Sequence, residues 1–414
     1  MNTPKIRFKG FTDDWEQRRL GNVADKAVDN RGKTPSISEE GTHPLLEVAS
    51  LGSGAPDYSK VTKYLSDETF KTELRAYIKE GDILFSTVGS IGLVSLMDTN
   101  ENAAIAQNIV AFRTKENYDS KFLYAMLSTE ENQYKAQRIV MGAVQPSIKV
   151  SQLVDVEYSV TENIVEQRKL GEYFLNLDNL ITLHQRKCDE TKQLKKFMLQ
   201  KMFPKNGEKN PEIRFEGFTD DWEQRKLGEM MVVTSVKRIH QSDWTDSGVR
   251  FLRARDVVAE SKKENVDEPL FISQEKYDEY SAVTGKVKKG DLLVTGVGTI
   301  GVPMLINSDE PLYFKDGNII WFKNENVIDG RFLYHSFNGL NIQKFIKESA
   351  GTGTVGTYTI ENGKKTPINL PPKKEEQEKI GEYFRNLDHL ITLHQRKCEK
   401  LKELKKYMLQ NMFV

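Results

Sequence analysis

Hydrophobic residues recur with heptad spacing in two long segments of the chain, 166–203 and 376–413. In both, apolar or small side chains alternate three and four positions apart, which is typical of helices that pack along one seam. The seam residues are Leu170, Phe174, Leu177, Ile181, His184, Cys188 and Thr191, then Ile380, Phe384, Leu387, Ile391, His394, Cys398 and Leu401. Lys195 and Lys405 interrupt the two seams. The pattern predicts two helices, each ~57 Å long at 1.5 Å per residue, that pair as an antiparallel coiled coil.

The chain is a tandem duplication. Residues 4–21 and 211–228 are identical at 15 of 18 positions with an offset of 207, and the two helical segments are identical at 28 of 38 positions with an offset of 210. The edges of each copy are therefore nearly the same, while the interiors differ apart from short matching stretches. Two modules with one fold and different surfaces, which read two different targets, would produce this pattern.

The interior of each copy mixes strand-like and helix-like patterns. Short apolar runs at 83–85, 109–112, 292–294 and 319–322 predict strands, and 121–126 and 331–337 predict helix starts. Each copy also begins with Thr12 or Thr219 before two aspartates, which predicts a short capped helix. The fold class is thus α+β, with two modules of one fold related by a pseudo-twofold axis and held at opposite ends of the coiled coil.

Domain boundaries follow from these patterns. We expect a first module at 1–160, a central long-helix region at 161–204, a second module at 205–370 and a C-terminal long-helix region at 371–414. Residues 204–211 are polar with a proline at each end, which indicates a linker between the copies.

Three motifs have both a functional and a structural interpretation. Residues 296–301 fit G-x-G-x-x-G, but Val302-Pro303 follows where a cofactor-binding loop needs a helix, so a tight turn between strands is favoured. Residues 369–372 resemble the Asn-Pro-Pro-aromatic motif of amino-methyltransferases, with Lys373 in place of the aromatic residue, and are interpreted as a linker into the second long helix.

The third motif is a pair of histidines and a pair of cysteines in the two helical seams. His184 and Cys188 are four residues apart, as are His394 and Cys398, and two such pairs could hold zinc. All four also occupy core positions of the heptad. A packed polar layer is therefore favoured, and we predict no metal site. No catalytic constellation recurs in both copies.

Basic and polar loop residues are the remaining functional candidates, because Arg, Lys, Gln and Asn are the side chains that read base edges in DNA. In the first copy these are Arg31, Lys33, Thr34, Ser36 and Gln145. In the second copy they are Lys237, Arg238, His240, Arg253, Arg255, Thr357 and Tyr358.

Composition limits where the chain acts and how it binds a polyanion. The two cysteines argue against a disulfide framework, and no signal peptide or run of ~18 apolar residues is present, so we expect a cytoplasmic protein without a membrane span. The 60 basic and 60 acidic residues cancel, and residues 166–203 and 376–413 carry net charges of +3 and +2. The modules are therefore mildly acidic, which indicates that a partner supplies much of any phosphate contact.

These motifs resemble those of the specificity (S) subunit of type I restriction–modification systems. The resemblance rests on F-x-G-F-x-x-x-W-E-x-R-x-L-G at each start, G-D-I/L-L…V-G-S/T-I-G within each copy, and E-Q-x-K-I/L-G-x-Y-F…L-D-x-L-I-x-L-H-Q-R-K leading into each long helix. They occur twice, in order, over nearly the whole chain. The resemblance implies two target-recognition domains that each read one half of a bipartite DNA site.

The resemblance also implies partners and chemistry. Two modification (M) subunits would dock on the helices, bind S-adenosylmethionine and methylate adenine N6 with base flipping, and restriction (R) subunits would complete a nuclease that uses ATP and Mg²⁺. This chain would then be non-catalytic and hold no cofactor. Two alternatives are a methyltransferase in its own right, which the degraded glycine motif disfavours, and a pure interaction scaffold, which does not explain the diverged surfaces.

Overall fold

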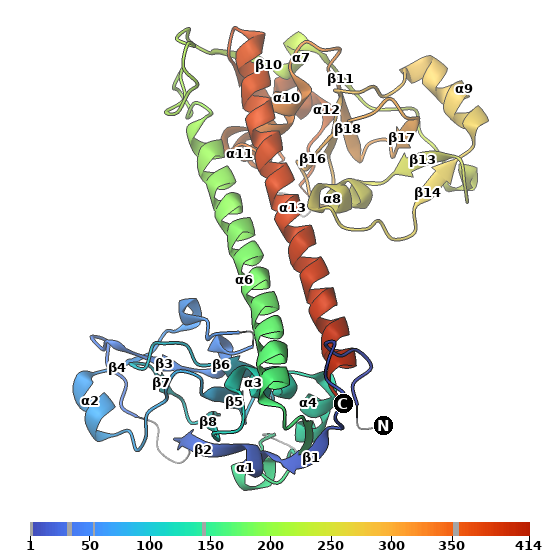
Figure 1. Cartoon of the computed structure of the whole chain (residues 1–414). Coiled ribbons are helices and arrows are strands. Elements are labelled where there is room, and N and C mark those ends of the chain that lie inside the picture. The colour runs from blue at the N-terminus through green and yellow to red at the C-terminus, as the bar shows by residue number, and fades with distance from the viewer. Residues whose placement is uncertain (1–2, 31–34, 53, 143–145, 351–355) are drawn as a thin grey trace. The chain divides into compact units, whose positions relative to one another are not determined.

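Figure 1 shows the computed structural model of the chain, which describes residues 3–30, 35–52, 54–142, 146–350 and 356–414. The chain divides into two compact units, unit 1 with Met1–Lys187 and His394–Val414, and unit 2 with Cys188–Leu393. Helices α6 (Ile164–Lys201) and α13 (Lys374–Met412) each contribute one part to each unit. Both lie within two residues of the predicted helical segments.

Unit 1 contains a module of short strands and helices followed by the first part of α6. Its strands are β1 (Glu16–Arg19), β2 (Ala24–Asp29), β3 (His43–Leu46), β4 (Tyr64–Leu65), β5 (Ile83–Ser86), β6 (Val94–Leu96), β7 (Ala104–Ile105), β8 (Ile109–Thr114) and β9 (Glu157–Val160). Its short helices are α1 (Leu20–Val23), η1 (Val48–Ser50), η2 (Tyr58–Lys60), α2 (Asp67–Thr72), α3 (Ser120–Leu127), α4 (Glu130–Gln137) and α5 (Val150–Leu153).

Unit 2 repeats this order with a different insertion. Its strands are β10 (Glu223–Lys226), β11 (Val232–Thr234), β12 (Trp244–Thr245), β13 (Val249–Leu252), β14 (Leu270–Ile272), β15 (Leu292–Thr295), β16 (Pro303–Leu305), β17 (Leu312–Phe314), β18 (Ile319–Lys323) and β19 (Pro367–Leu370). Its short helices are α7 (Leu227–Met230), η3 (Gln241–Asp243), α8 (Ala254–Lys262), α9 (Gln274–Thr284), α10 (Gly330–Phe337), α11 (Leu340–Ser349) and α12 (Ile360–Lys365).

The two units share a framework and differ in one sheet. The order β2-β8-β5-β6 in unit 1 matches β11-β18-β15-β16 in unit 2, and the two-stranded sheet β1-β9 matches β10-β19. The remaining sheet is β4-β3-β7 in unit 1 and β12-β14-β13-β17 in unit 2. This confirms the prediction of two α+β modules of one fold with diverged interiors.

Strand β5 shows why the apolar runs form buried strands. Successive side chains of a strand point to opposite faces, so a strand with a core on each side is apolar throughout. Ile83 and Phe85 face a core that includes residues of α3 and α6, and Leu84 faces a second core beneath β3 and β7. All four residues of β5 are buried, and the same holds for β15 in unit 2.

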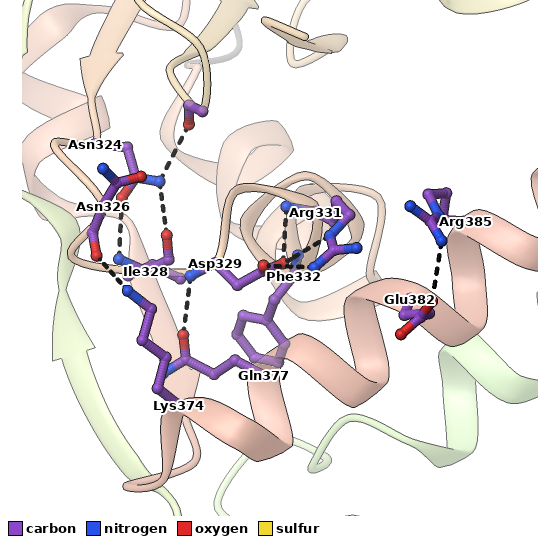
Figure 2. Close-up of polar contacts among 11 residues, drawn as sticks. Asn324, Asn326, Ile328, Asp329, Arg331, Phe332, Lys374, Gln377, Glu382 and Arg385 are labelled. Carbon is purple, nitrogen blue, oxygen red and sulfur yellow. Dashed lines mark hydrogen bonds and ion pairs between the residues drawn. The ribbon is translucent and has the colours of Figure 1, made fainter.

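Each module is joined to its long helix by the same contacts. In unit 1 the backbone N–H of Asp119 donates to Gln167 Oε1 at 2.8 Å, and the Asp119 carboxylate caps α3. In unit 2 the N–H of Asp329 donates to Gln377 Oε1 at 3.1 Å, and the Asp329 carboxylate caps α10 (Figure 2). The repeated sequence around these glutamines therefore encodes the junction of module and helix.

Within each unit the two long helices run antiparallel. In unit 1, Lys405 Nζ donates to Asp178 Oδ1 at 2.6 Å, and His184 lies beside His394. In unit 2, Lys195 Nζ donates to Asp388 Oδ1 at 2.7 Å. The two lysines that interrupt the predicted seams therefore pair with aspartates of the opposite helix.

Two local predictions are wrong. The segments after Thr12 and Thr219 form no helix: they lead into β1 and β10, whose partners are β9 and β19. Residues 369–370, interpreted as part of a linker, belong to β19. In both cases a cap or turn signal is local, and pairing with a strand more than a hundred residues away outweighs it. No helix among the described residues combines the length and the apolar character that a bilayer span requires.

We predict that Gly171→Ala will destabilise unit 1. A Cβ at this position of α6 would lie 2.6 Å from the Phe122 backbone nitrogen and from Lys121 Cβ, where α3 begins. Overpacking of this kind costs ~1–3 kcal/mol, which exceeds the ~1 kcal/mol that alanine gains over glycine in a helix. Thermal unfolding followed by circular dichroism measures the effect. Asn176→Ala, at an exposed position of the same helix, is the control, and equal melting temperatures of the two variants would contradict the prediction.

Candidate nucleic-acid interface

Most predicted contact residues of the first copy are not described. Arg31, Lys33, Thr34 and Gln145 lie outside the described residues. Ser36 is exposed, and its backbone N–H donates to Glu73 Oε2 at 3.3 Å. Its hydroxyl is therefore the one predicted polar group of this copy that the described structure places at the surface.

In unit 2, three predicted residues lie on the segment that follows β11. Lys237 Nζ lies 3.9 Å from the centroid of the Tyr280 ring on α9. Arg238 is 67% exposed and pairs with Asp316 at 2.9 Å, and His240 is exposed. Of these side chains, Lys237 lies against α9, and all three are exposed where a phosphate or a base edge could reach them.

Arg253 and Arg255 have different surroundings. Arg253 is 18% exposed, and it donates to both carboxylate oxygens of Asp256 at 2.9 Å and to the Glu268 carbonyl at 2.9 Å. It thereby holds the start of α8 against the chain that enters β14. Arg255 is 60% exposed, and its ion pair with Glu268 is 3.7 Å long. Of the two, only Arg255 has a guanidinium open to solvent.

Thr357 and Tyr358 also differ in their exposure to solvent. Thr357 is exposed, whereas Tyr358 is 1% exposed. The Tyr358 hydroxyl hydrogen-bonds to the Thr366 hydroxyl, and burial raises the pKa of the phenol above its usual range. The Tyr358 ring therefore lies in the core, where it packs against β18 and α12, and is not available at the surface. The sequence around it resembles a loop, which is why a surface position was predicted.

A group of cations that was not predicted from the sequence covers tyrosine rings along α9. Lys276 Nζ lies 4.9 Å from the Tyr280 ring centroid, and Lys286 Nζ lies 5.2 Å from that of Tyr277. Together with Lys237 these form a surface, which we call the α9 cluster. Lysines and tyrosines four and nine positions apart are the only signal in the sequence, and this spacing does not show that Lys237 joins them.

The predicted coiled-coil residues lie between the two helices within the units. Phe174, Leu177, Ile181, Cys188, Phe384, Leu387 and Cys398 are buried, and Ile391, His184 and His394 are half-buried. His184 Nδ1 and His394 Nδ1 are 3.0 Å apart, so one ring nitrogen donates and the other accepts. Burial lowers the pKa of His184, and its proximity to His394, Lys397 and Lys187 lowers it further. No group of three or more metal-binding side chains exists among the described residues.

A large polar cavity lies in unit 2 beside α13, which we call the unit 2 cleft. It has a volume of about 1240 Å³. Arg331 and Arg385 line it, the first held by Asp329 at 3.0 Å and the second by Glu382 at 3.0 Å (Figure 2). Its other charged and polar lining residues include Lys195, Lys263, Lys288, Lys289, Tyr334, His335, Asn338 and Asp388.

His335 is a buried lining residue of this cleft. It is 2% exposed, its Nδ1 has no hydrogen-bond partner among the described residues, and its Nε2 lies 3.9 Å from Asp388 Oδ2. Burial, and then the positive charges of Lys195 and Arg331, lower its pKa to about 3. His335 is therefore neutral at physiological pH, and its Nδ1 has no partner within the described part of the chain.

Comparisons with known proteins agree on one family. The family model "Type I restriction modification DNA specificity domain" matches twice, at residues 12–193 and 219–403. The chain is 25% identical to the type I restriction enzyme MjaVIII specificity subunit of Methanocaldococcus jannaschii, over 95% of this chain and 91% of the relative. It is 31% identical to a putative type I restriction enzyme specificity subunit of Haemophilus influenzae, over 40% of this chain and 41% of the relative.

A solved structure shares the fold. The S subunit of a type I restriction–modification system from M. genitalium superposes with a TM-score of 0.68 at 17% identity, over 100% of this chain and 99% of that one. At this identity the likeness concerns the fold alone.

We predict that acid will destabilise unit 2 through His335. Its pKa is about 3 in the folded chain and about 6.5 when unfolded, so the unfolded chain takes up the proton first. The stabilising contribution is complete above pH 6.5 and falls by ~1.4 kcal/mol per pH unit as the pH drops below that value toward 3. Melting temperatures measured between pH 7.5 and 5 should fall less steeply for His335→Ala than for the wild type. The control is His389→Ala, at an exposed position of α13, and a pH slope for His335→Ala equal to that of the control would refute the prediction.

Proposed function

The chain belongs to the type I restriction–modification DNA specificity family, and on this premise we propose that it reads a bipartite DNA site and directs partner subunits to it. Each unit would read one half of the site. The observation that carries the proposal is the shared framework with unlike insertions: β4-β3-β7 in unit 1 stands where β12-β14-β13-β17 stands in unit 2. Selection for two different half-sites would keep the framework and change the insertions.

The surface around α9 is the part of unit 2 that we propose to face DNA. The exposed residues Lys237, Arg238 and His240 follow β11, and the exposed Arg255 stands at the start of α8. Side chains of these types can contact phosphates or base edges. In unit 1, Arg31, Lys33, Thr34, Ser36 and Gln145 keep the corresponding proposed role.

We propose that the chain itself is non-catalytic and that S-adenosylmethionine, ATP and Mg²⁺ are held by methyltransferase (M) and restriction (R) subunits. The geometry of the glycine motif supports this. Residues 296–301 form a turn between the antiparallel strands β15 and β16, without a helix start that could receive a phosphate or ribose. A Cβ on Gly296 would lie 2.6 Å from the Tyr358 carbonyl oxygen, so close packing accounts for that glycine.

An exposed apolar stripe on the long helices is the proposed docking surface for M subunits. In unit 1 it consists of Leu180, Leu183, Leu404 and Tyr407, and in unit 2 of Leu390, Leu393, Leu194 and Phe197. All are at least 37% exposed, and within each helix they occupy the same two heptad positions. Exposed apolar surface of this kind marks interaction sites, and two equivalent stripes fit two M subunits, with adenine N6 methylation as the reaction that they perform.

Exchange of the interior of unit 1 should change one half of the methylated site. Residues 24–114, from β2 to β8, would be replaced with the equivalent part of a related specificity subunit, which leaves α3 and its contacts with α6 intact. Sequencing of methylated adenines in cells that contain the M subunit should reveal a bipartite motif for the wild-type chain and a motif with one new half for the chimaera. A motif unchanged in both halves would remove the proposed role of unit 1 in recognition.

Charges on the apolar stripe should release M subunits one at a time. Leu180→Glu with Leu183→Glu should reduce the complex from two M subunits to one. Each substitution removes an apolar contact and would bury a carboxylate charge in the interface. We expect affinity at that site to fall at least tenfold, which corresponds to ~1.4 kcal/mol. Adding Leu390→Glu and Leu393→Glu should release the second subunit, as measured by native mass spectrometry. The matched controls are Asn176→Glu and Asn386→Glu, both at exposed helix positions, which should keep two M subunits; loss in the controls alone would count against this docking surface.

A further inference from the structure

The two units treat one repeated tyrosine–aspartate pair differently. In unit 1 the Tyr124 hydroxyl donates to Asp178 Oδ2 at 2.8 Å and accepts the backbone N–H of Gly54 at 2.7 Å. Tyr124 and Asp178 are each 1% exposed. A loop of the chain's own module therefore closes this site, and a backbone N–H is the group that completes it.

In unit 2 the equivalent pair faces the unit 2 cleft. Tyr334 and Asp388 both line it, and the Asp388 side chain is 31% exposed. Among the described residues, no backbone N–H donates to the Tyr334 hydroxyl. Among the described residues of unit 2, no backbone N–H thus takes the place of Gly54, and the side chain near the Tyr334 hydroxyl is that of Asn338.

Three lining residues of the cleft are specific to the second copy. At an offset of 210, Arg331 replaces Lys121, His335 replaces Ala125, and Arg385 replaces Leu175. Arg385 is exposed and paired with Glu382, so it costs little, whereas a histidine buried in place of alanine costs stability unless a ligand compensates. The unsatisfied Nδ1 of His335 is the clearest sign of such a cost, since buried polar groups almost always have partners.

We propose that the unit 2 cleft binds an extended, acidic segment of the M subunit, whose backbone N–H donates to the Tyr334 hydroxyl as Gly54 donates to Tyr124. This inference rests on the proposed function, because it takes the M subunit as the partner. The segment completes the polar site that unit 1 completes with its own chain, and it provides a partner for His335 Nδ1.

The charges of the lining favour an acidic segment. Six cations and four carboxylates line the cleft. Lys195 is paired with Asp388 and Arg331 with Asp329, whereas Lys288 and Lys289 are exposed and form no ion pair with a described residue. Carboxylates of an incoming chain therefore meet these two unpaired lysines in the lining of the cleft. The same lysines would repel a basic segment.

The consequence is that the two M subunits bind unequally. The one that contacts unit 2 gains the segment in the cleft, while the one that contacts unit 1 finds that site closed. Photo-crosslinking with p-benzoyl-phenylalanine in place of Asn338, a lining residue of the cleft, tests this in the complex of the full chain with M subunits. The matched control carries the same group in place of Ser128, its counterpart in the first copy.

The expected result is a crosslink from position 338, and none from 128, to one acidic stretch of the M subunit, identified by mass spectrometry. In addition, Tyr334→Phe with Arg385→Leu should weaken the tighter of the two M sites at least fivefold by titration calorimetry and leave the other unchanged. If both M subunits bind but the crosslink is absent and the affinities do not change, the inference fails while the proposed function stands. A crosslink to DNA or to a second copy of this chain also overturns it, and a wild-type chain that binds no M subunit overturns the proposed function itself.

Discussion

Within each unit, the antiparallel register of the two long-helix segments depends on an ion pair between them. Lys405 pairs with Asp178, which is 2% exposed, and Lys195 pairs with Asp388. A heptad seam of leucines and isoleucines tolerates a shift of one heptad, but such a shift would leave a buried carboxylate without its cation, which costs several kcal/mol. Buried polar pairs of this kind specify register better than they add stability.

The same logic extends to the start of each copy. Arg7 donates to both oxygens of Glu166 in unit 1, and Arg214 does the same with Glu376 in unit 2. Both glutamates have almost no exposed surface and stand in the first turn of a long helix, where a carboxylate also interacts favourably with the helix dipole. The near-identical edges of the two copies thus encode one such buried ion pair in each unit. The regions that diverge between the copies take no part in these ion pairs.

The sequence was sufficient to predict what periodicity and repetition determine. Heptads located α6 and α13, and short apolar runs located β5, β8, β15 and β18. It did not reveal what depends on distant contacts: the residues after Thr12 carry helix signals, yet pairing with β9 leads them into a strand. The candidate site shows the same limit. Arg253 and Tyr358 have the residue types of a DNA-contacting loop. However, the Arg253 side chain forms an ion pair with Asp256, and the Tyr358 side chain is buried in the core.

Ion pairing also explains how a neutral chain can belong to a DNA-reading family. Many cations of the modules are already neutralised at short range: Arg113 lies 2.7 Å from Asp82, and Arg253 lies 2.9 Å from Asp256, with both carboxylates 1% exposed. A cation that is bound to a buried carboxylate contributes little to the release of counterions from DNA, which dominates non-specific affinity. The modules are thus suited to discriminating between sequences rather than to holding the duplex. Under the proposed function, tight binding then requires partner subunits to supply phosphate contacts, so that DNA is held firmly only by an assembled complex.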